Sequence, residues 1–152
     1  MIDYARIYAA QLLELLRPSE RAVDAISVDY AAGRERPDDD HPDGGAGSMA
    51  GMLAKAARLT PFLVLTERRL LVVDELGDPE RQAVTWAVPL ERVAVVRHDP
   101  RPPVDLGRIL VGFDDSSLVR LRAGLLLPFA ARRFARAFAD LQGNSRPRRG
   151  RG

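Results

Sequence analysis

The sequence predicts a mainly β (α+β) fold, in which about seven short antiparallel strands are closed by one C-terminal helix. Residues 61 to 113 alternate short apolar runs with polar turns, which is typical of strands joined by hairpins. Residues 117 to 122 alternate apolar and basic side chains, with the period of two expected of a half-buried antiparallel strand. Phe134 and Phe138 then recur at helical spacing and indicate an amphipathic helix that covers the sheet.

The N-terminal segment, residues 1 to 17, predicts an apolar helix over residues 2 to 16. Its few polar side chains fall on one narrow face, so most of its circumference needs cover from other residues. Pro18 disfavours helical geometry at Arg17 and ends the helix. Two accounts stay open: the helix packs on its own sheet, filling the open end of the barrel, or it forms a surface for self-association or a partner.

The first strand is predicted at residues 22 to 30, where Asp24 and Asp29 indicate that one of its faces is in water. Residues 33 to 51 are acidic and rich in Gly, which predicts a mobile loop, and a short helix follows at residues 52 to 59. Six further strands are predicted at residues 62 to 66, 69 to 74, 82 to 88, 91 to 98, 107 to 113 and 117 to 122.

The closing helix is predicted to begin at Pro128, which suits a first helical turn, and to end at Gly143. Residues 142 to 152 are predicted to be a disordered basic tail, because they contain no core-forming side chain. The chain is thus expected to consist of an N-terminal helix, one domain that contains the flexible loop, and a tail, with boundaries at residues 1 to 17, 20 to 141 (loop 33 to 51) and 142 to 152.

The excess positive charge of the chain lies in the tail. Of 152 residues, 23 are basic and 21 are acidic, and four of the basic residues are arginines after Leu141, so that 19 precede them. Such a tail can hold nucleic acid weakly through counterion release, and no other nucleic-acid binding is expected. The chain lacks cysteine, which excludes thiolate zinc sites, and shows neither a signal peptide nor a run of about 18 apolar residues. We therefore expect a cytoplasmic protein.

No catalytic, cofactor or metal site is predicted. The acidic run around Asp39 fits a calcium loop poorly, because Ala50 stands where the bidentate glutamate belongs. Residues 45 to 50 match a G-x-G-x-x-A pattern, but they follow an acidic loop rather than a buried strand. His41 and His98 are the only histidines, and a triad would need one of them beside a nucleophile and an orienting acid. We therefore expect neither enzymatic activity nor a bound cofactor.

The chain resembles the bacterial pleckstrin-homology-like (PH-like, GRAM-like) families over roughly residues 20 to 141. The residues that carry the resemblance form a turn, a strand entry and a late hairpin: Thr66, Arg68 and Arg69; Pro89, Leu90 and Val93; Gly107 and Phe113. The resemblance implies a PH-like barrel of about seven antiparallel strands capped by a C-terminal helix, to which this chain adds its N-terminal helix. It also implies a binding or assembly module without naming a ligand.

Two departures separate the chain from eukaryotic lipid-binding PH domains. Where those domains place basic residues in the first inter-strand loop, this chain has the acidic stretch 38 to 43, which would repel an anionic headgroup. The only tryptophan, Trp86, lies in a predicted strand rather than in the closing helix. Phosphoinositide recognition is therefore not implied.

The sequence thus predicts a non-enzymatic adaptor or self-assembling module that acts through protein-protein contacts. The alternative is a peripheral membrane module in which the first helix lies in the interface, although that helix carries few basic residues. The expected partner is another protein or a second copy of the chain, as a homo-oligomer. The residues expected to interact with it are Ile2, Leu12, Leu13, Leu16, Leu125, Leu126, Arg120 and Arg122.

Overall fold

The computed structural model describes residues 3–30, 45, 47–103, 106–124 and 128–145. This part of the chain contains seven strands and five helical segments. In chain order they are α1 (Tyr4–Ile7), α2 (Ala9–Leu15), β1 (Ala22–Asp29), α4 (Met49–Ala56), β2 (Phe62–Thr66), β3 (Arg69–Asp74), β4 (Ala83–Pro89), the 3-10 turn η1 (Leu90–Arg92), β5 (Val93–His98), β6 (Arg108–Phe113), β7 (Leu118–Ala123) and α5 (Pro128–Ser145).

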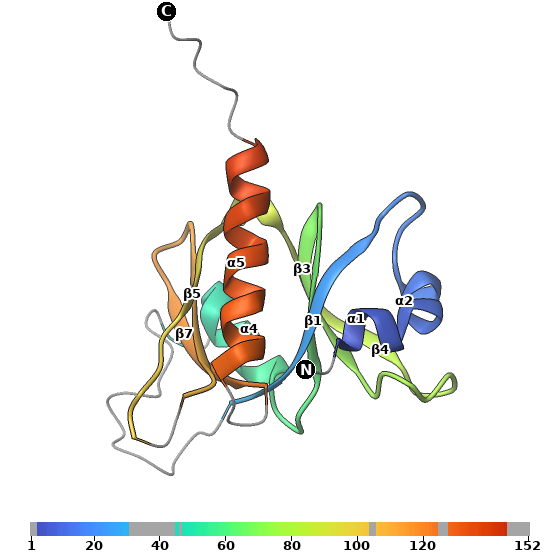
Figure 1. The fold of residues 1–152 in the computed structure, drawn as a ribbon, viewed down its shortest axis with the longest axis horizontal. Helices are drawn as coiled ribbons and strands as arrows, with labels where there is room; N and C mark the ends of the chain where they lie inside the picture. Colours follow the sequence, from blue (N-terminus) through green and yellow to red (C-terminus); the bar gives the residue numbers. More distant parts are fainter. Residues whose placement is uncertain (1–2, 31–44, 46, 104–105, 125–127, 146–152) are drawn as a thin grey trace, which may run out of the picture.

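All seven strands form one antiparallel sheet in the order β4-β3-β2-β1-β7-β6-β5. Strand β1 links its two halves, because residues 22 to 27 pair with β2 while Val28 and Asp29 pair with β7. Figure 1 shows the two halves on either side of α5, which closes the barrel. The predicted fold class, seven antiparallel strands with a C-terminal helix and an added N-terminal helical segment, is therefore confirmed.

The main core lies between the two halves of the sheet, α4 and α5. Phe134 and Phe138 of α5 are 0% and 2% exposed, as their helical spacing predicted. Alternate residues of β7 enter the same core, so that Val119 and Leu121 are buried while Arg120 is not. Both amphipathic elements thus present the faces that the sequence indicated.

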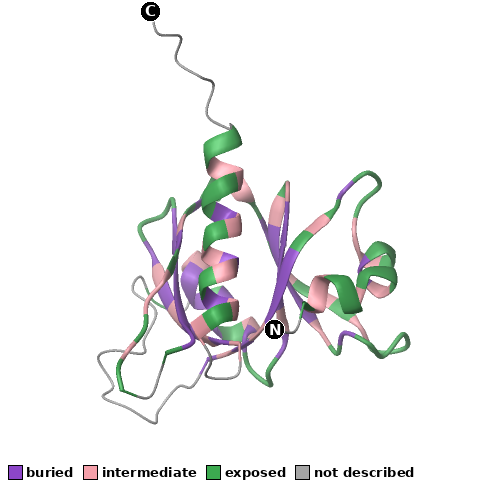
Figure 2. Ribbon diagram, in the orientation of Figure 1, coloured by how far each residue is buried: buried purple, intermediate pink, exposed green. Residues whose placement is uncertain are grey.

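A second core lies on the outer face of β1, β2 and β3, where α1 and α2 cover the sheet. Its buried members are Leu12, Ala25, Val64, Leu71, Val73 and Leu76. Strands β2 and β3 are consequently buried on both faces, which explains their continuous apolar runs FLVL and LLVV. Figure 2 shows the buried residues of β1 and β3 between α5 on one side and α1 and α2 on the other. The N-terminal segment therefore packs on its own sheet, but it does not fill the open end of the barrel.

The N-terminal segment forms two helices rather than the single helix predicted, because the backbone leaves helical geometry at Tyr8. The Tyr8 ring stacks on Tyr4, at a centroid distance of 6.2 Å, and meets the edge of Phe62 at 5.8 Å. It also packs against Gly77, where a Cβ atom would lie 2.9 Å from Tyr8 Cε1. The break at Tyr8 therefore accompanies the insertion of this ring into the second core.

The prediction that one face of β1 lies in water is wrong at Asp24. This residue is 3% exposed, and its carboxylate pairs with Arg133 of α5 at 3.0 Å. Asp29, by contrast, is half buried at the end of the strand. The partner of Asp24 could not be predicted, because Arg133 lies 109 residues further along the chain.

Both ends of α4, which ends at Ala56 rather than at Leu59, and the end of α5 also differ from the prediction. Helix α4 begins at Met49, inside the predicted loop, because Ser48 caps it and Asp115 accepts a hydrogen bond from the Met49 N–H at 3.0 Å. Helix α5 continues past Gly143 to Ser145. Gly143 is exposed there, and an exposed helical glycine costs only about 1 kcal/mol relative to alanine. Residues 33 to 44 and 46 of the predicted loop, and the tail from residue 146, lie outside the described residues.

Candidate binding groove

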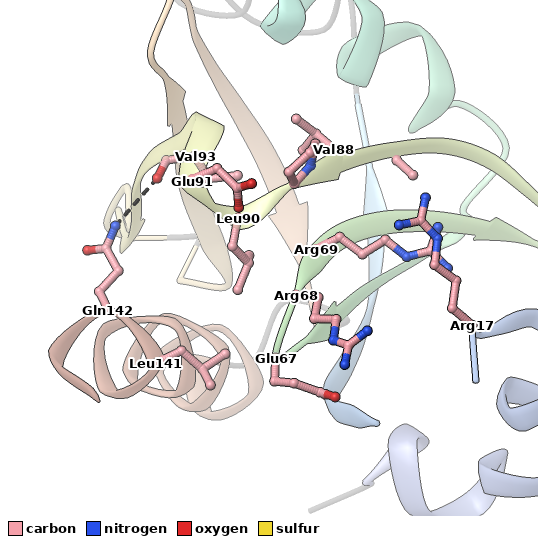
Figure 3. Close-up of a pocket in the computed structure, with 12 residues that line it drawn as sticks. Arg17, Glu67, Arg68, Arg69, Val88, Leu90, Glu91, Val93, Leu141 and Gln142 are labelled. Carbon is pink, nitrogen blue, oxygen red and sulfur yellow. Dashed lines mark hydrogen bonds between the residues drawn. The ribbon is translucent and has the colours of Figure 1, made fainter. Parts of the chain in front are cut away.

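A groove of about 690 Å³ lies where the β2–β3 turn, η1 and the C-terminal end of α5 meet. Its lining contains apolar and charged side chains in similar numbers (Figure 3). The residues that line it are Arg17, Glu67, Arg68, Arg69, Ala87, Val88, Pro89, Leu90, Glu91, Val93, Leu141 and Gln142. We call this hollow the turn groove.

The β2–β3 turn forms one wall of the turn groove and is held by a buried hydroxyl. Thr66 Oγ1 accepts hydrogen bonds from the N–H groups of Arg68 and Arg69, at 3.1 and 3.0 Å. It also donates to Glu20 Oε2 at 2.9 Å. The predicted tight turn from Thr66 to Arg69 is therefore confirmed, and its geometry is set by side-chain as well as backbone hydrogen bonds.

Behind this turn, Glu20 and Arg69 form a buried ion pair. Arg69 Nε and Nη2 each donate to the Glu20 carboxylate at 2.8 Å, and the exposed fractions of the two side chains are 11% for Arg69 and 0% for Glu20. Burial opposes the ionisation of Glu20, but hydrogen bonds from Arg69, the Arg17 N–H and Thr66 outweigh it and lower the pKa of Glu20. The positive charge of Arg69 is thus already compensated within the protein.

The opposite wall consists of η1, the start of β5 and the last turns of α5. The Leu90 N–H donates to the Arg68 carbonyl at 2.9 Å, which joins η1 to the β2–β3 turn. Gln142 Nε2 lies 3.4 Å from the carbonyl oxygens of Val93 and Ala94 and links α5 to β5. In Figure 3 the side chains of Leu90 and Leu141 lie together at this end of the groove.

The charged side chains lie mainly at the other end of the groove. Arg17 and Arg68 are exposed and form no ion pair with the described residues. Glu67 accepts two hydrogen bonds from the Arg21 N–H, at 2.9 and 3.0 Å, and Glu91 is exposed on η1. The turn groove therefore combines an apolar half at Leu90 and Leu141 with an arginine half at Arg17 and Arg68 (Figure 3).

The structure does not bring the predicted interaction residues of the N-terminal segment into one surface. Leu12 is 1% exposed in the second core, and Leu16 is half buried beside it. Leu13, in contrast, is 69% exposed. Ile2, Leu125 and Leu126 lie outside the described residues.

The two predicted arginines of β7 also lie away from the turn groove. Arg120 is half buried and donates from Nε to Asp99 at 3.1 Å. Arg122 is half buried two residues further along the strand, opposite Asp29 of β1. Sequence reasoning thus missed the groove, although the Thr-x-Arg-Arg turn and the Pro-Leu strand entry that carried the resemblance supply half of its lining.

No constellation for catalysis or metal binding was recognised in the described part of the chain. Its acidic and histidine side chains form no group of three or more that could hold a metal ion. His98 Nε2 lies 2.7 Å from the Leu106 carbonyl oxygen, so this ring is engaged with the backbone. Among the residues placed in the structure, no helix is long and apolar enough to cross a bilayer.

One seven-stranded antiparallel sheet and a closing helix form the scaffold on which these residues lie. No family model matches the chain, and no curated protein matches its sequence. Among solved structures it is similar to the Vps36 N-terminal PH domain, with 18% identity and a TM-score of 0.47 over 85% of this chain and 86% of that one. It is also similar to the C-terminal domain of an unknown protein from Leishmania infantum, with 10% identity and a TM-score of 0.40 over 77% and 78% of the two chains.

Proposed function

We propose that this chain is a non-catalytic, cytoplasmic protein-binding module of the bacterial PH-like, GRAM-like kind, and that the turn groove takes up a peptide segment of its partner. The groove is the observation that carries the proposal. Its volume of about 690 Å³ and its mixture of apolar walls with a few polar groups are typical of ligand sites. PH-like domains commonly bind proteins or lipids, which is compatible with this role.

The peripheral-membrane alternative is less well supported by the same residues. A membrane-bound first helix would need its apolar face free, but Leu12 is buried and Leu16 half buried in the second core. At the groove, Glu67 and Glu91 would face an anionic bilayer together with the arginines and would oppose its approach. A protein partner can instead match both signs of charge.

Self-assembly through the N-terminal helices is likewise less favoured than recognition of a different protein. Of their large apolar side chains, Ile7 and Leu13 remain exposed, by 60% and 69%. The surface area of two side chains of this size falls far short of the roughly 800 Å² that each partner buries in a stable interface. The adaptor role therefore takes precedence over the homo-oligomer.

A peptide selection tests the proposed function. Random twelve-residue peptides displayed on phage would be selected on the wild-type protein, and the recovered peptides would be titrated by fluorescence polarisation. Ala87 is exposed on β4 and lines the groove, so Ala87→Trp should fill the groove without entering the core and weaken binding about tenfold or more.

Ala83→Trp is the matched control, because Ala83 is also exposed on β4 but does not line the groove. This variant should bind the selected peptides as the wild type does. A selection that enriches no peptide, or peptides that bind Ala87→Trp as tightly as the wild type, would contradict the proposed function.

A further inference from the structure

We infer that the peptide recognised by the turn groove carries an acidic side chain, Asp or Glu, next to a large apolar side chain. This inference rests on the proposed function and specifies the chemistry of its ligand. It follows from the way in which the groove divides its two kinds of lining between its two ends (Figure 3).

The arginine half provides the site for the acid. Arg69 lines the groove but is neutralised by Glu20, at 2.8 Å, whereas Arg17 and Arg68 are exposed and have no ion pair within the described chain. Guanidinium groups bind carboxylates through two parallel hydrogen bonds, which gives them both strength and direction. A carboxylate entering this half would therefore form charge-assisted hydrogen bonds with Arg17 or Arg68, neither of which has an ion pair within the described chain.

The apolar half provides the site for the neighbouring side chain. Leu90 and Leu141 are half buried and line the groove together with the buried Val88 and Val93. A ligand side chain of the size of Leu or Phe would remove these surfaces from water, at a gain that scales with the apolar area covered. Because the Leu90 N–H is bonded to the Arg68 carbonyl, the two halves adjoin, and the acidic and apolar residues should be adjacent or one position apart.

The charge balance favours a peptide over a lipid surface. Glu67 and Glu91 line the same groove as Arg17 and Arg68, while Arg69 is paired with Glu20. The groove as a whole is thus close to neutral and attracts an anion at one end only. A bilayer with many anionic headgroups would meet both glutamates, whereas a peptide places one carboxylate at the arginine half and can leave the Glu91 end neutral or basic.

Two fluorescein-labelled peptide pools test the inference by fluorescence anisotropy. Both are eight residues long with Leu or Phe at the fourth position, and the fifth position is Asp or Glu in one pool and the isosteric Asn or Gln in the other. We expect the acidic pool to bind the wild-type protein about tenfold or more tightly, as is typical of a hydrogen bond to a charged group. The Arg17→Gln, Arg68→Gln double variant should lose this preference.

Arg97→Gln is the control, because Arg97 is an exposed arginine of β5 that does not line the groove, and it should keep the preference. Equal binding of both pools to the wild type, or a preference that survives in the double variant, overturns the inference while leaving selected peptides and the proposed function intact. Binding of neither pool overturns the inference, and a failed phage selection in addition overturns the proposed function. Sedimentation with vesicles containing 30% phosphatidylserine forms a third arm: if it depends on Arg17 and Arg68, the arginine half belongs to a lipid and the inference is overturned.

Discussion

Two buried carboxylates show how the surroundings of similar residues shift their pKa values in opposite directions. Glu20 lies behind the β2–β3 turn, where three hydrogen-bonding partners outweigh its burial and lower its pKa. Asp24 lies under α5, where burial outweighs the hydrogen bonds and charge of Arg133 and raises its pKa. Neither assignment follows from the sequence, because the pairs Glu20–Arg69 and Asp24–Arg133 join residues 49 and 109 positions apart.

Replacement of Glu20 by Gln should destabilise the protein by about 3 kcal/mol at neutral pH, since it removes one partner of a buried ion pair. A carboxylate with a lowered pKa stabilises the folded state above its ordinary pKa, and this contribution is lost as the pH falls through the folded value. The difference in the free energy of unfolding between Glu20→Gln and wild type, measured with urea, should therefore become smaller below about pH 4. Glu67→Gln, a nearby and more exposed change, serves as the control; a pH-independent difference for Glu20→Gln would contradict the assignment.

Replacement of Asp24 by Asn should have the opposite pH dependence. A carboxyl group with a raised pKa contributes its full stability below its ordinary pKa, and that contribution is lost as the pH rises through the folded value. The free energy of unfolding of Asp24→Asn should thus increase relative to that of the wild type as the pH is raised from about 4 to 7. Urea titrations across this range would detect it, and a difference that falls with rising pH would show that Arg133 lowers the pKa of Asp24 instead.

At the scale of elements, the strands were predictable because their signals are local. All seven were placed within about two residues of their observed ends, since apolar runs and turn residues mark both the inner face and the boundaries. The side of the sheet covered by the N-terminal helices was not predictable. The continuous apolar runs of β2 and β3 demanded a second cover, but no residue of those runs specifies which segment supplies it.

The turn groove illustrates the same limit for the candidate site. Its turn and strand entry were noticed in the sequence, whereas Arg17, Leu141 and Gln142 come from the two ends of the chain. Only the packing of α5 along β5 and the course of the chain after α2 bring these residues together. A site assembled from three distant segments leaves no contiguous motif.

The role of α5 as the lid of the main core can be tested by shortening one side chain. Phe138 is 2% exposed, so Phe138→Ala should destabilise the protein by about 3 to 5 kcal/mol through lost burial and a residual cavity. Phe129, on the same helix, is 58% exposed, and Phe129→Ala should change the free energy of unfolding by less than about 1 kcal/mol. Thermal or urea unfolding curves that coincide for the two variants would contradict the role of α5 in covering the main core.

The molecule as a whole consists of one sheet with a core on each face. The main core holds four buried aromatic side chains and is covered by both longer helices, whereas the second core is smaller and closed by two short helices. Each core buries residues from β2 and β3, so the two share these strands and should unfold together. The N-terminal segment is thus part of the folded unit rather than an appendage to it.

Cooperation between the two cores predicts the effect of a charge placed in the smaller one. Leu12→Glu should abolish or strongly weaken folding, because Leu12 is 1% exposed and a buried unpaired carboxylate is costly. Leu13→Glu should leave stability within about 0.5 kcal/mol of wild type, since Leu13 is 69% exposed. Urea unfolding and light scattering would separate this account from assembly: a folded Leu12→Glu protein of lower mass than the wild type would assign Leu12 to an interface between copies.

The position of β1 in the sheet order sets how the molecule opens. Residues 24 to 28 of this strand pair with β2 or β7 between α1 and α5 and are almost entirely buried, so their amides should exchange only when the fold opens. Strands β4 and β5 lie at the free edges, joined by η1, and their outer amides are protected by far fewer partners. Amide hydrogens should therefore exchange with deuterium first at the margins of the turn groove and last at the centre of the sheet. The wall that a ligand would contact is thus expected to open locally more readily than the rest of the fold.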